Sequence, residues 1–264
     1  MFHSDTDRTW NDVGDSGPYF GVFTNDRVRA PALDEEAHQA FFESGERYTE
    51  FLFDALKEFA PRFRPRRVLD FGCGIGRVTL PLAARAEMAV GVDASEGMLA
   101  AAVGHSARLG ARNTTFVRDD ENLSRVSGLY DMIHSFIAFQ HIAPRRGEAI
   151  LSRLIGLLRE DGVGALHFTY GFGSRTPLSR RFLVRAYQAV PLLYGLRNMV
   201  KGRPFDEPLM QMNEYNLNRL LRILEESGCH RVQVRFTETG LFGQPFYGAV
   251  ILFQKSATDI LAHG

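Results

Sequence analysis

Three glycines alternate in the stretch from residue 67 to residue 77, and they give the first indication of chemistry in this chain. Gly72, Gly74 and Gly76 follow a β-branched and apolar run that contains Asp70, and an apolar-periodic helical pattern begins after them. Glycine permits positive φ in a tight turn, and the absence of a Cβ lets a ligand lie against the backbone beside the partly positive end of a helix. The pattern therefore predicts a strand, a turn and a helix that bind a nucleotide-like ligand, with a bare tight turn as the alternative.

The spacing of these glycines narrows the kind of ligand. A dinucleotide-binding turn needs glycine at its first, third and sixth positions, and the sixth position here is Arg77. The Gly-x-Gly-x-Gly pattern after an acid resembles instead the first motif of the class I S-adenosylmethionine (SAM) dependent methyltransferases of the small-molecule type. The resemblance implies SAM as the cofactor, and it places these residues in the cofactor site: Asp70, Gly72, Gly74, Gly76 and Arg77.

A second acid stands where the next predicted strand, residues 88–92, ends. This acid, Asp93, can accept hydrogen bonds from both hydroxyls of a ribose. A helix N-cap is the alternative role for Asp93, but Ser95 fits that role better because Met98 begins the following apolar face. In the resembling family the residues after this acid flank the adenine, which implies contacts from Ala94 and Met98. Ordinary core is the alternative for Met98.

Two further strand ends complete the series. Residues 114–117 form a predicted strand that leads into Asp119 and Asp120, and residues 129–133 form the next, which leads into Ser135. The resemblance implies that Asp119, or else Asp120, accepts a hydrogen bond from the adenine amino group, and that Ser135 borders the cofactor. Arg118 stands where many relatives have glycine, so the alignment of this motif can shift by one residue, which leaves Asp119 and Asp120 as alternatives. The run 136–142, which ends in Gln-His-Ile, is similar to the family's exit from the fourth strand.

The composition bounds the class of protein. With 264 residues, 45% of them hydrophobic, and a formal net charge of zero, the chain can bury a substantial core and has no overall attraction to nucleic acid or to an anionic membrane. Cys73 and Cys229 match no metal or disulfide spacing, so no metal site is expected and a reduced compartment fits. The polar and acidic first residues contain no apolar signal segment, and no apolar run is long enough to span a membrane. We expect a cytoplasmic protein.

The order of the predicted elements indicates an α/β fold. After an N-terminal loop and a helix over residues 34–59, five strands alternate with helices, the fifth over residues 162–169. A helix over residues 213–228 and strands over residues 231–237 and 247–254 follow. Alternation of this kind predicts a Rossmann-like, mostly parallel sheet with helices on both faces. The resemblance implies seven strands, the last of them antiparallel. The expected organisation is an N-terminal loop and helical cap (1–60), a SAM-binding core (61–170), a basic helical lid insertion (171–212) and the C-terminal part of the core (213–264).

The insertion 171–212 is not needed by such a fold, and it carries the one strong charge bias of the chain. No acid occurs from residue 162 through residue 205, whereas seven residues there are basic: Arg175, Arg180, Arg181, Arg185, Arg197, Lys201 and Arg203. One interpretation is a solvated helix face that pairs with the acidic N-terminal segment, and another is a lid that attracts an anionic substrate and excludes water. A membrane-surface helix is the third, but Pro191 interrupts the pattern and favours a hinged pair of helices.

Methyl transfer needs two positioned reactants and the removal of a proton. His141, in the exit loop of the fourth strand, and His167, near the end of the fifth, are candidate catalytic bases because a neutral imidazole suits proton transfer near pH 7. A structural histidine is the alternative for each, and His134 is less favoured because it directly follows a strand. The candidate substrate-binding residues are aromatic or basic: Tyr19, Phe20, Phe23, Tyr170 and Arg181.

Three function classes follow from these observations. The leading hypothesis is a methyltransferase that acts on an oxygen or nitrogen of a small molecule in a biosynthetic or sugar-modifying pathway. A non-catalytic SAM-binding scaffold or regulator is one alternative, and a nicotinamide-dependent oxidoreductase is another, which Arg77 disfavours. Nucleic acid is not an expected substrate, because no Asn-Pro-Pro-aromatic or Asp-Pro-Pro-aromatic tetrapeptide follows the fourth strand and no basic RNA module is appended. The expected partner is a small-molecule methyl acceptor; a membrane is disfavoured, and a homodimer is left open.

Overall fold

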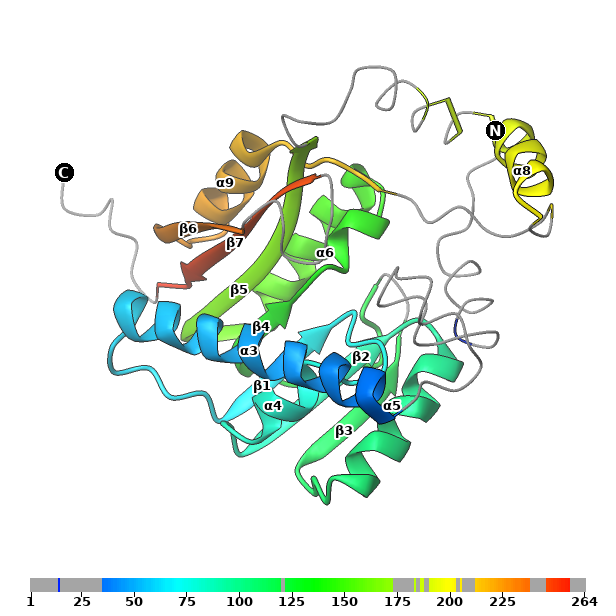
Figure 1. Cartoon of the computed structure of the whole chain (residues 1–264). Coiled ribbons are helices and arrows are strands. Elements are labelled where there is room, and N and C mark those ends of the chain that lie inside the picture. The colour runs from blue at the N-terminus through cyan, green and yellow to red at the C-terminus, as the bar shows by residue number, and fades with distance from the viewer. Residues whose placement is uncertain are drawn as a thin grey trace.

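A seven-stranded sheet forms the centre of the molecule. The computed structural model describes residues 35–119, 122–172, 190–202, 212–237 and 246–256, together with Gly14, Leu183, Ala186, Tyr187 and Phe205. The strand order is β3-β2-β1-β4-β5-β7-β6 (Figure 1). Strands β1 to β5 run parallel, whereas β7 runs antiparallel to both of its neighbours, β5 and β6. The predicted Rossmann-like α/β sheet with an antiparallel last strand is confirmed.

The strands begin and end close to where the hydrophobic pattern predicts them. They are β1 (Arg67–Phe71), β2 (Met88–Asp93), β3 (Thr114–Arg118), β4 (Tyr130–Ser135), β5 (Leu158–Phe172), β6 (Arg231–Thr237) and β7 (Phe246–Gln254). β5 is longer at both ends than the predicted residues 162–169. It starts beside Tyr130 of β4, and it continues past an irregularity in register to pair with Phe246 of β7.

Helices cover both faces of the sheet (Figure 1). α3 (Glu35–Phe59) and α4 (Thr79–Ala83) lie on one face, where Leu52 and Leu56 of α3 pack in one cluster with Met132 of β4. α6 (Pro144–Leu157) and α9 (Leu217–Glu226) lie on the other face, and α5 (Glu96–Arg108) packs beside β2 and β3. Burial of these apolar faces is the main term that stabilises such a layered fold.

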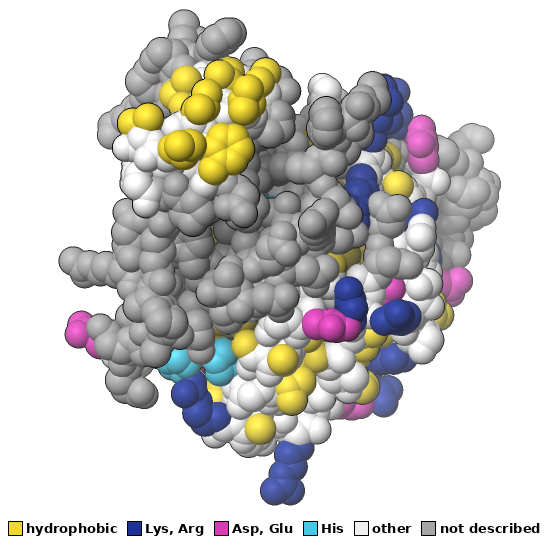
Figure 2. Space-filling view, turned by 90° about the vertical axis from the view of Figure 1, so that its right-hand side faces the viewer, with side chains coloured by type: hydrophobic (Ala, Val, Ile, Leu, Met, Phe, Trp, Pro, Cys, Tyr) yellow, Lys and Arg dark blue, Asp and Glu magenta, His cyan; other side chains and the backbone are white. Residues whose placement is uncertain are grey.

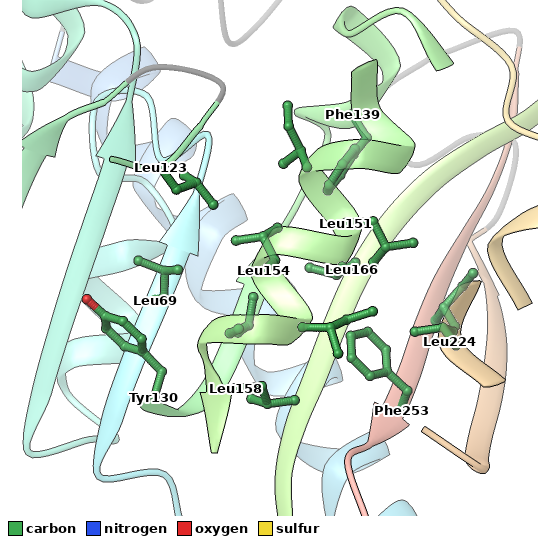
Figure 3. Close-up of a cluster of buried hydrophobic side chains, with 14 of the residues drawn as sticks. Leu69, Leu123, Tyr130, Phe139, Leu151, Leu154, Leu158, Leu166, Leu224 and Phe253 are labelled. Atoms are coloured by element: carbon green, nitrogen blue, oxygen red, sulfur yellow. The ribbon is translucent and has the colours of Figure 1, made fainter. Parts of the chain in front are cut away.

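The larger core cluster lies between the sheet and the α6 and α9 layer. Leu154 of α6 and Leu166 of β5 belong to this cluster, in which Phe253 of β7 lies beside Leu224 of α9 (Figure 3). Gly164 makes room for the Phe253 ring, because a Cβ at that position would lie 2.0 Å from the ring. This close packing holds the strand ends in a defined relation to one another, which the site at those ends requires.

The segment before α9 departs from the prediction. A helix was expected from residue 213, but α9 begins only at Leu217, with Asn216 as its N-cap, whose side chain accepts a hydrogen bond from the Arg219 amide. The amides of Asn213 and Tyr215 instead donate to the Gln140 carbonyl, after β4, and to the Thr169 carbonyl of β5, which holds this segment against the sheet. Within the described ranges, no helix is long and apolar enough to cross a membrane.

Candidate functional site at the carboxyl edge of the sheet

The glycine turn joins β1 to α4 and adopts the conformation that its sequence predicts. Gly72, Gly74 and Gly76 have φ values of 70°, 53° and 85°, which lie in the left-handed region that favours glycine. The Gly72 amide donates to the carbonyl of Val92 over 2.8 Å, and the Cys73 amide donates to the same carbonyl over 3.0 Å. The turn is therefore held against the end of β2.

Asp93 ends β2 and faces this turn. One oxygen of its carboxylate, Oδ2, accepts from the Gly74 amide over 2.9 Å, and the other, Oδ1, accepts from the Ser95 amide over 3.0 Å. Burial raises the pKa of Asp93, and the backbone amides of Ser95, Gly74 and Ala94 oppose that rise by favouring the charged form. A carboxylate oxygen can accept more than one hydrogen bond, so Asp93 retains acceptor capacity for the hydroxyls of a ribose.

The residues after Asp93 form the start of α5 as expected. Ser95 is the N-cap of this helix, and its hydroxyl accepts from the Met98 amide over 3.3 Å. Met98 is 1% exposed, so its side chain belongs to the core beside this loop. Gly14 lies against the same residues, since a Cβ on Gly14 would be 2.1 Å from the Ser95 hydroxyl oxygen. Gly14 therefore lies beside the start of α5.

Asp119 follows β3 and is tied to the same edge. Its amide donates to the Asp93 carbonyl over 3.1 Å, and its buried carboxylate accepts from the Arg125 amide over 3.1 Å. Arg118 points away, bonding to the Ala94 carbonyl and to Glu96. The ends of β1, β2 and β3 are thus joined by hydrogen bonds into one edge. Asp120 lies outside the described residues.

A buried polar chain runs beneath the glycine turn. Asp70 of β1 accepts from the Thr79 hydroxyl over 2.5 Å, and its other oxygen lies 2.7 Å from Nδ1 of His134. Nε2 of His134 lies 3.0 Å from the hydroxyl of Tyr48 on α3. Burial raises the pKa of Tyr48 well above its usual value, and the Asp70 charge adds to that rise. A neutral tyrosine therefore donates to Nε2 while Nδ1 of His134 donates to Asp70.

This arrangement places Asp70 and His134 as supports of the turn. Both side chains are almost completely buried, and they connect β1, β4, α3 and α4. The sequence predicts His134 only as a less favoured base, and it predicts no role for Tyr48 or Thr79 at this site. No local motif marks either residue. Tyr48 is distant in sequence and reaches the site only through the packing of α3.

Arg77 is directed from the turn toward α3. Its guanidinium donates to the Ser44 hydroxyl over 3.1 Å and lies over the rings of Phe41 and Phe136. Burial lowers the pKa of Arg77 to about 10, so the side chain remains charged at neutral pH. Gly45 of α3 permits this close approach, because a Cβ there would lie 2.2 Å from the Arg77 carbonyl oxygen. Arg77 thus connects the glycine turn to the helix that covers it.

Ser135 ends β4 on the same edge. It is fully buried, and its hydroxyl oxygen has no hydrogen-bond partner among the residues that the structure describes. Buried hydroxyls are normally satisfied, so such an atom is suited to a ligand group or to a water molecule.

The exit loop of β4 carries a second network around His141. Gln140 and His141 lie in the short helix η2 (Phe139–His141), and their Nε2 atoms are 3.1 Å apart. The Gln140 amide oxygen accepts from the Thr169 hydroxyl over 3.1 Å, which orients the amide nitrogen toward the imidazole. The Gln140 carbonyl accepts from both the backbone and the side chain of Asn213. Residues from β4, β5 and the segment before α9 therefore position the His141 ring.

His167 lies deeper on β5, in different surroundings. Its Nε2 is 3.4 Å from the Thr237 hydroxyl, and its ring contacts Phe136 edge to face. Burial lowers the pKa of His167 to about 4, and the charge of a protonated His134 would act in the same direction. This imidazole is neutral at pH 7, but a conjugate acid of such low pKa makes it a weak base.

An open depression lies where β5 leaves the sheet. It has a volume of about 450 Å³, and Tyr170 and residues 214–218 line it. The Tyr170 ring stacks on Tyr247 with centroids 5.8 Å apart. The remaining predicted substrate residues lie outside the described residues: Tyr19, Phe20, Phe23 and Arg181.

The fold and this edge define a class of protein. The structure resembles the magnesium protoporphyrin IX methyltransferase of Synechocystis PCC 6803 with bound S-adenosylhomocysteine (SAH), with a TM-score of 0.64 and 18% identity over 96% of this chain and all of that one. It also resembles the Haemonchus contortus phosphoethanolamine N-methyltransferase 2 in complex with phosphomonomethylethanolamine and SAH, with a TM-score of 0.60 and 16% identity over 97% of this chain and 61% of that one. At this identity the likeness shows the fold, which is that of the class I methyltransferases.

The sequence match is more specific about one segment. Residues 68–162 match the family described as a methyltransferase domain. The 23S rRNA (uracil(1939)-C(5))-methyltransferase of Burkholderia thailandensis is 35% identical over 116 residues, which are 42% of this chain and 24% of that protein. The chain thus spans about a quarter of the length of this relative. The matched segment is thus similar to a methyltransferase domain, and the fold is one that solved methyltransferase structures with bound SAM or SAH share.

Proposed function

We propose that this protein transfers the methyl group of SAM to an oxygen or nitrogen of a small molecule. The observation that carries the proposal is the hydrogen-bonded edge formed by Gly74, Asp93 and Asp119, at the ends of three adjacent strands. Ligands of open α/β sheets bind at this edge. The glycine turn would hold the methionine half of the cofactor, Asp93 the ribose, and Asp119 the adenine amino group.

The cofactor supplies a methyl group on a positively charged sulfur, and the protein's own residues do the rest. In-line attack requires the acceptor to be held near the methyl carbon, and its proton must leave. His141 is the proposed proton acceptor at the exit of β4. Its basic nitrogen, Nε2, accepts from the Gln140 amide in this structure, so it would release that hydrogen bond to take the proton. His167 is less suited, since its low pKa makes it a weak base. An amine acceptor needs less help from a base.

A small-molecule acceptor is supported by two observations. Residues 170 and 214–218 line a depression of about 450 Å³, which is a size that accommodates a small molecule. The two structural relatives are named for small-molecule acceptors, which are a magnesium porphyrin and a phosphorylated amine. The rRNA methyltransferase relative matches over only a quarter of its length, so its substrate is not carried over. Tyr170, together with Tyr19, Phe20, Phe23 and Arg181, forms the proposed acceptor-binding set.

The insertion 171–212 is the proposed lid over this acceptor. It leaves the sheet directly at the end of β5, beside the depression, and a lid that excludes water would protect the reactive sulfonium. Its excess of arginine favours an anionic acceptor, such as a carboxylate or a sugar phosphate.

Calorimetric titration of the full chain with SAM, SAH and NAD tests the class. Binding of SAM and SAH without NAD is the expected result, and the opposite pattern would identify the oxidoreductase alternative. Incubation with labelled SAM and a cell extract then separates an enzyme from a scaffold, because only an enzyme transfers label to an acceptor. Label in a small molecule supports the proposal, whereas label confined to RNA contradicts it.

A further inference from the structure

The helix α8 (Pro191–Val200) in the insertion has its apolar side turned outward. Five of its aliphatic side chains are exposed, and the exposed fractions are 61% for Leu192, 43% for Leu193, 49% for Leu196, 59% for Met199 and 88% for Val200. At about 100° per residue, these five positions fall within about 120° of the helix circumference. Figure 2, in which the right-hand side of Figure 1 faces the viewer, shows the resulting hydrophobic cluster at the upper left.

The buried side of α8 carries a polar residue and a glycine, whereas a packed helix normally buries its apolar side. Asn198 is fully buried, and Gly195 packs so closely on Phe205 that a Cβ would lie 2.6 Å from its ring. An amphipathic helix of a globular protein ordinarily turns its apolar stripe to the core and its polar residues to solvent. The outward stripe of α8 therefore indicates a surface that meets something apolar outside the described fold.

Basic residues accompany this stripe. Arg197 lies at its edge, next to Leu193 around the helix, and Lys201 follows one helical turn later at an exposed position. In the sequence, all seven charged residues from 162 through 205 are basic, although the whole chain has no net charge. The combination of an aliphatic stripe and a basic border is the pattern of helices that lie in the interface of an anionic membrane.

Pro191 starts the helix α8 and does not interrupt it. As an interruption of the helical pattern it disfavoured a membrane-surface helix, but Pro191 is the first residue of α8. Proline at a helix start is compatible with the helix, because the missing N–H is one that would have no partner within the helix. The stripe from Leu192 to Val200 is therefore continuous.

We propose that α8 docks the protein on the surface of a membrane that contains anionic lipids, with these aliphatic side chains among the acyl chains and Arg197 and Lys201 at the headgroups. A second copy of the chain fits less well, because an isologous contact would bring two basic segments together. A protein groove fits less well too, since the stripe contains no Trp or Tyr of the kind that dominates such interfaces. The helix also stands apart from the layers of the sheet in Figure 1, which leaves the stripe accessible.

Co-sedimentation of the full chain with vesicles tests this inference. Phosphatidylcholine vesicles that contain phosphatidylglycerol should bind the protein about 10-fold better than pure phosphatidylcholine vesicles, and added salt should reduce the difference. Replacement of both Leu192 and Leu196 by Ser should weaken binding by about 10-fold or more. Leu109→Ser is the matched control, because Leu109 is also 61% exposed but lies at the end of α5.

A charge-matched pair tests the basic border. The double variant Arg197→Gln with Lys201→Gln should lose about 10-fold in binding to the anionic vesicles. Lys57→Gln with Arg222→Gln, on α3 and α9, should bind as the parent does. SAM titration of every variant checks that the fold is retained, and it separates this inference from the proposed function.

Three results would overturn the inference. The first is no binding of the parent chain to the anionic vesicles. The second is equal binding by the parent and the Leu192/Leu196 variant. The third is a concentration-dependent dimer, measured by analytical ultracentrifugation, that this variant abolishes, because it would assign the stripe to a second copy. Vesicle binding without SAM binding would leave the docking surface standing and contradict the proposed function alone.

Discussion

Nδ1 of His134 lies 2.7 Å from Oδ1 of Asp70, and both side chains are buried beneath the glycine turn. The pair joins β1 to β4, the adjacent parallel strands at which the order of the strands in the sheet reverses. A charge buried this deeply is stabilised by its partners, so removal of one partner is costly. The stability of the turn therefore depends on residues that need not touch a ligand.

His134→Phe should lower the free energy of unfolding by about 3 kcal/mol, because it leaves Asp70 with one hydrogen-bond partner fewer. Tyr48→Phe is the milder comparison, and removal of its hydroxyl alone should cost about 1 kcal/mol. Urea unfolding followed by circular dichroism measures both values. Equal stability of the His134 variant and the parent would show that the pair does not support the turn.

Asp93→Ala should weaken SAM and SAH binding by about 100-fold, because it removes the proposed ribose acceptor together with a partner of the Gly74 amide. Asp131→Ala is a suitable control. The Asp131 carboxylate also accepts from a backbone amide, that of Arg67, but at the opposite end of the sheet. Calorimetric titration should find SAM affinity lost in the first variant and kept in the second. Unchanged affinity in Asp93→Ala would place the ribose elsewhere.

Gly72→Ala should destabilise the turn by at least about 1 kcal/mol and reduce SAM affinity. The φ of Gly72 is 70°, and a Cβ there would lie 2.3 Å from the Cβ of Ala138. Gly104 lies in α5 with no heavy atom near the position of a Cβ, so Gly104→Ala should raise stability by about 0.5 to 1 kcal/mol. Thermal unfolding compares the two, and a stabilising Gly72→Ala would contradict the role of positive φ.

His167 should make the protein less stable in mild acid. Its pKa is about 4 in the folded protein and 6.5 in its ordinary state, so the unfolded chain binds the extra proton first as the pH falls. Stability should therefore decrease from about pH 6.5 to about pH 4, by ~3 kcal/mol in total from this group. His167→Gln should remove this part of the pH dependence, whereas His230→Gln, at an exposed position, should retain it. Parallel slopes for parent and His167→Gln, from urea unfolding at several pH values, would argue against a buried neutral histidine.

His141→Ala should reduce kcat by about 100-fold once an acceptor is known, without a change in SAH affinity, if His141 receives the proton. Gln140→Leu should reduce kcat less and alter the dependence of kcat on pH, because it removes the group that orients the imidazole. Steady-state kinetics across pH distinguishes the two roles. Full activity of His141→Ala would move the base elsewhere or remove the need for one.

Local sequence determined much of the fold and of the proposed cofactor edge. Alternating glycines permit positive φ, and a hydrophobic period of two or of 3.6 indicates strands and helices without knowledge of their neighbours. Gly72, Asp93 and Asp119 could therefore be located from the chain alone, and parallel strands necessarily gather their carboxyl ends at one edge. The seven strands appear in the structure in the predicted order.

Tertiary structure decided which side chains meet across that edge. Tyr48 reaches His134 only because α3 crosses the sheet, and Asn213 fixes Gln140 only because the chain returns after the insertion. The late start of α9 also depends on tertiary structure, since the amides of Asn213 and Tyr215 are held by the carbonyls of Gln140 and Thr169. The outward stripe of α8 also required the fold, because periodicity reveals that a helix has an apolar side but not which way that side faces.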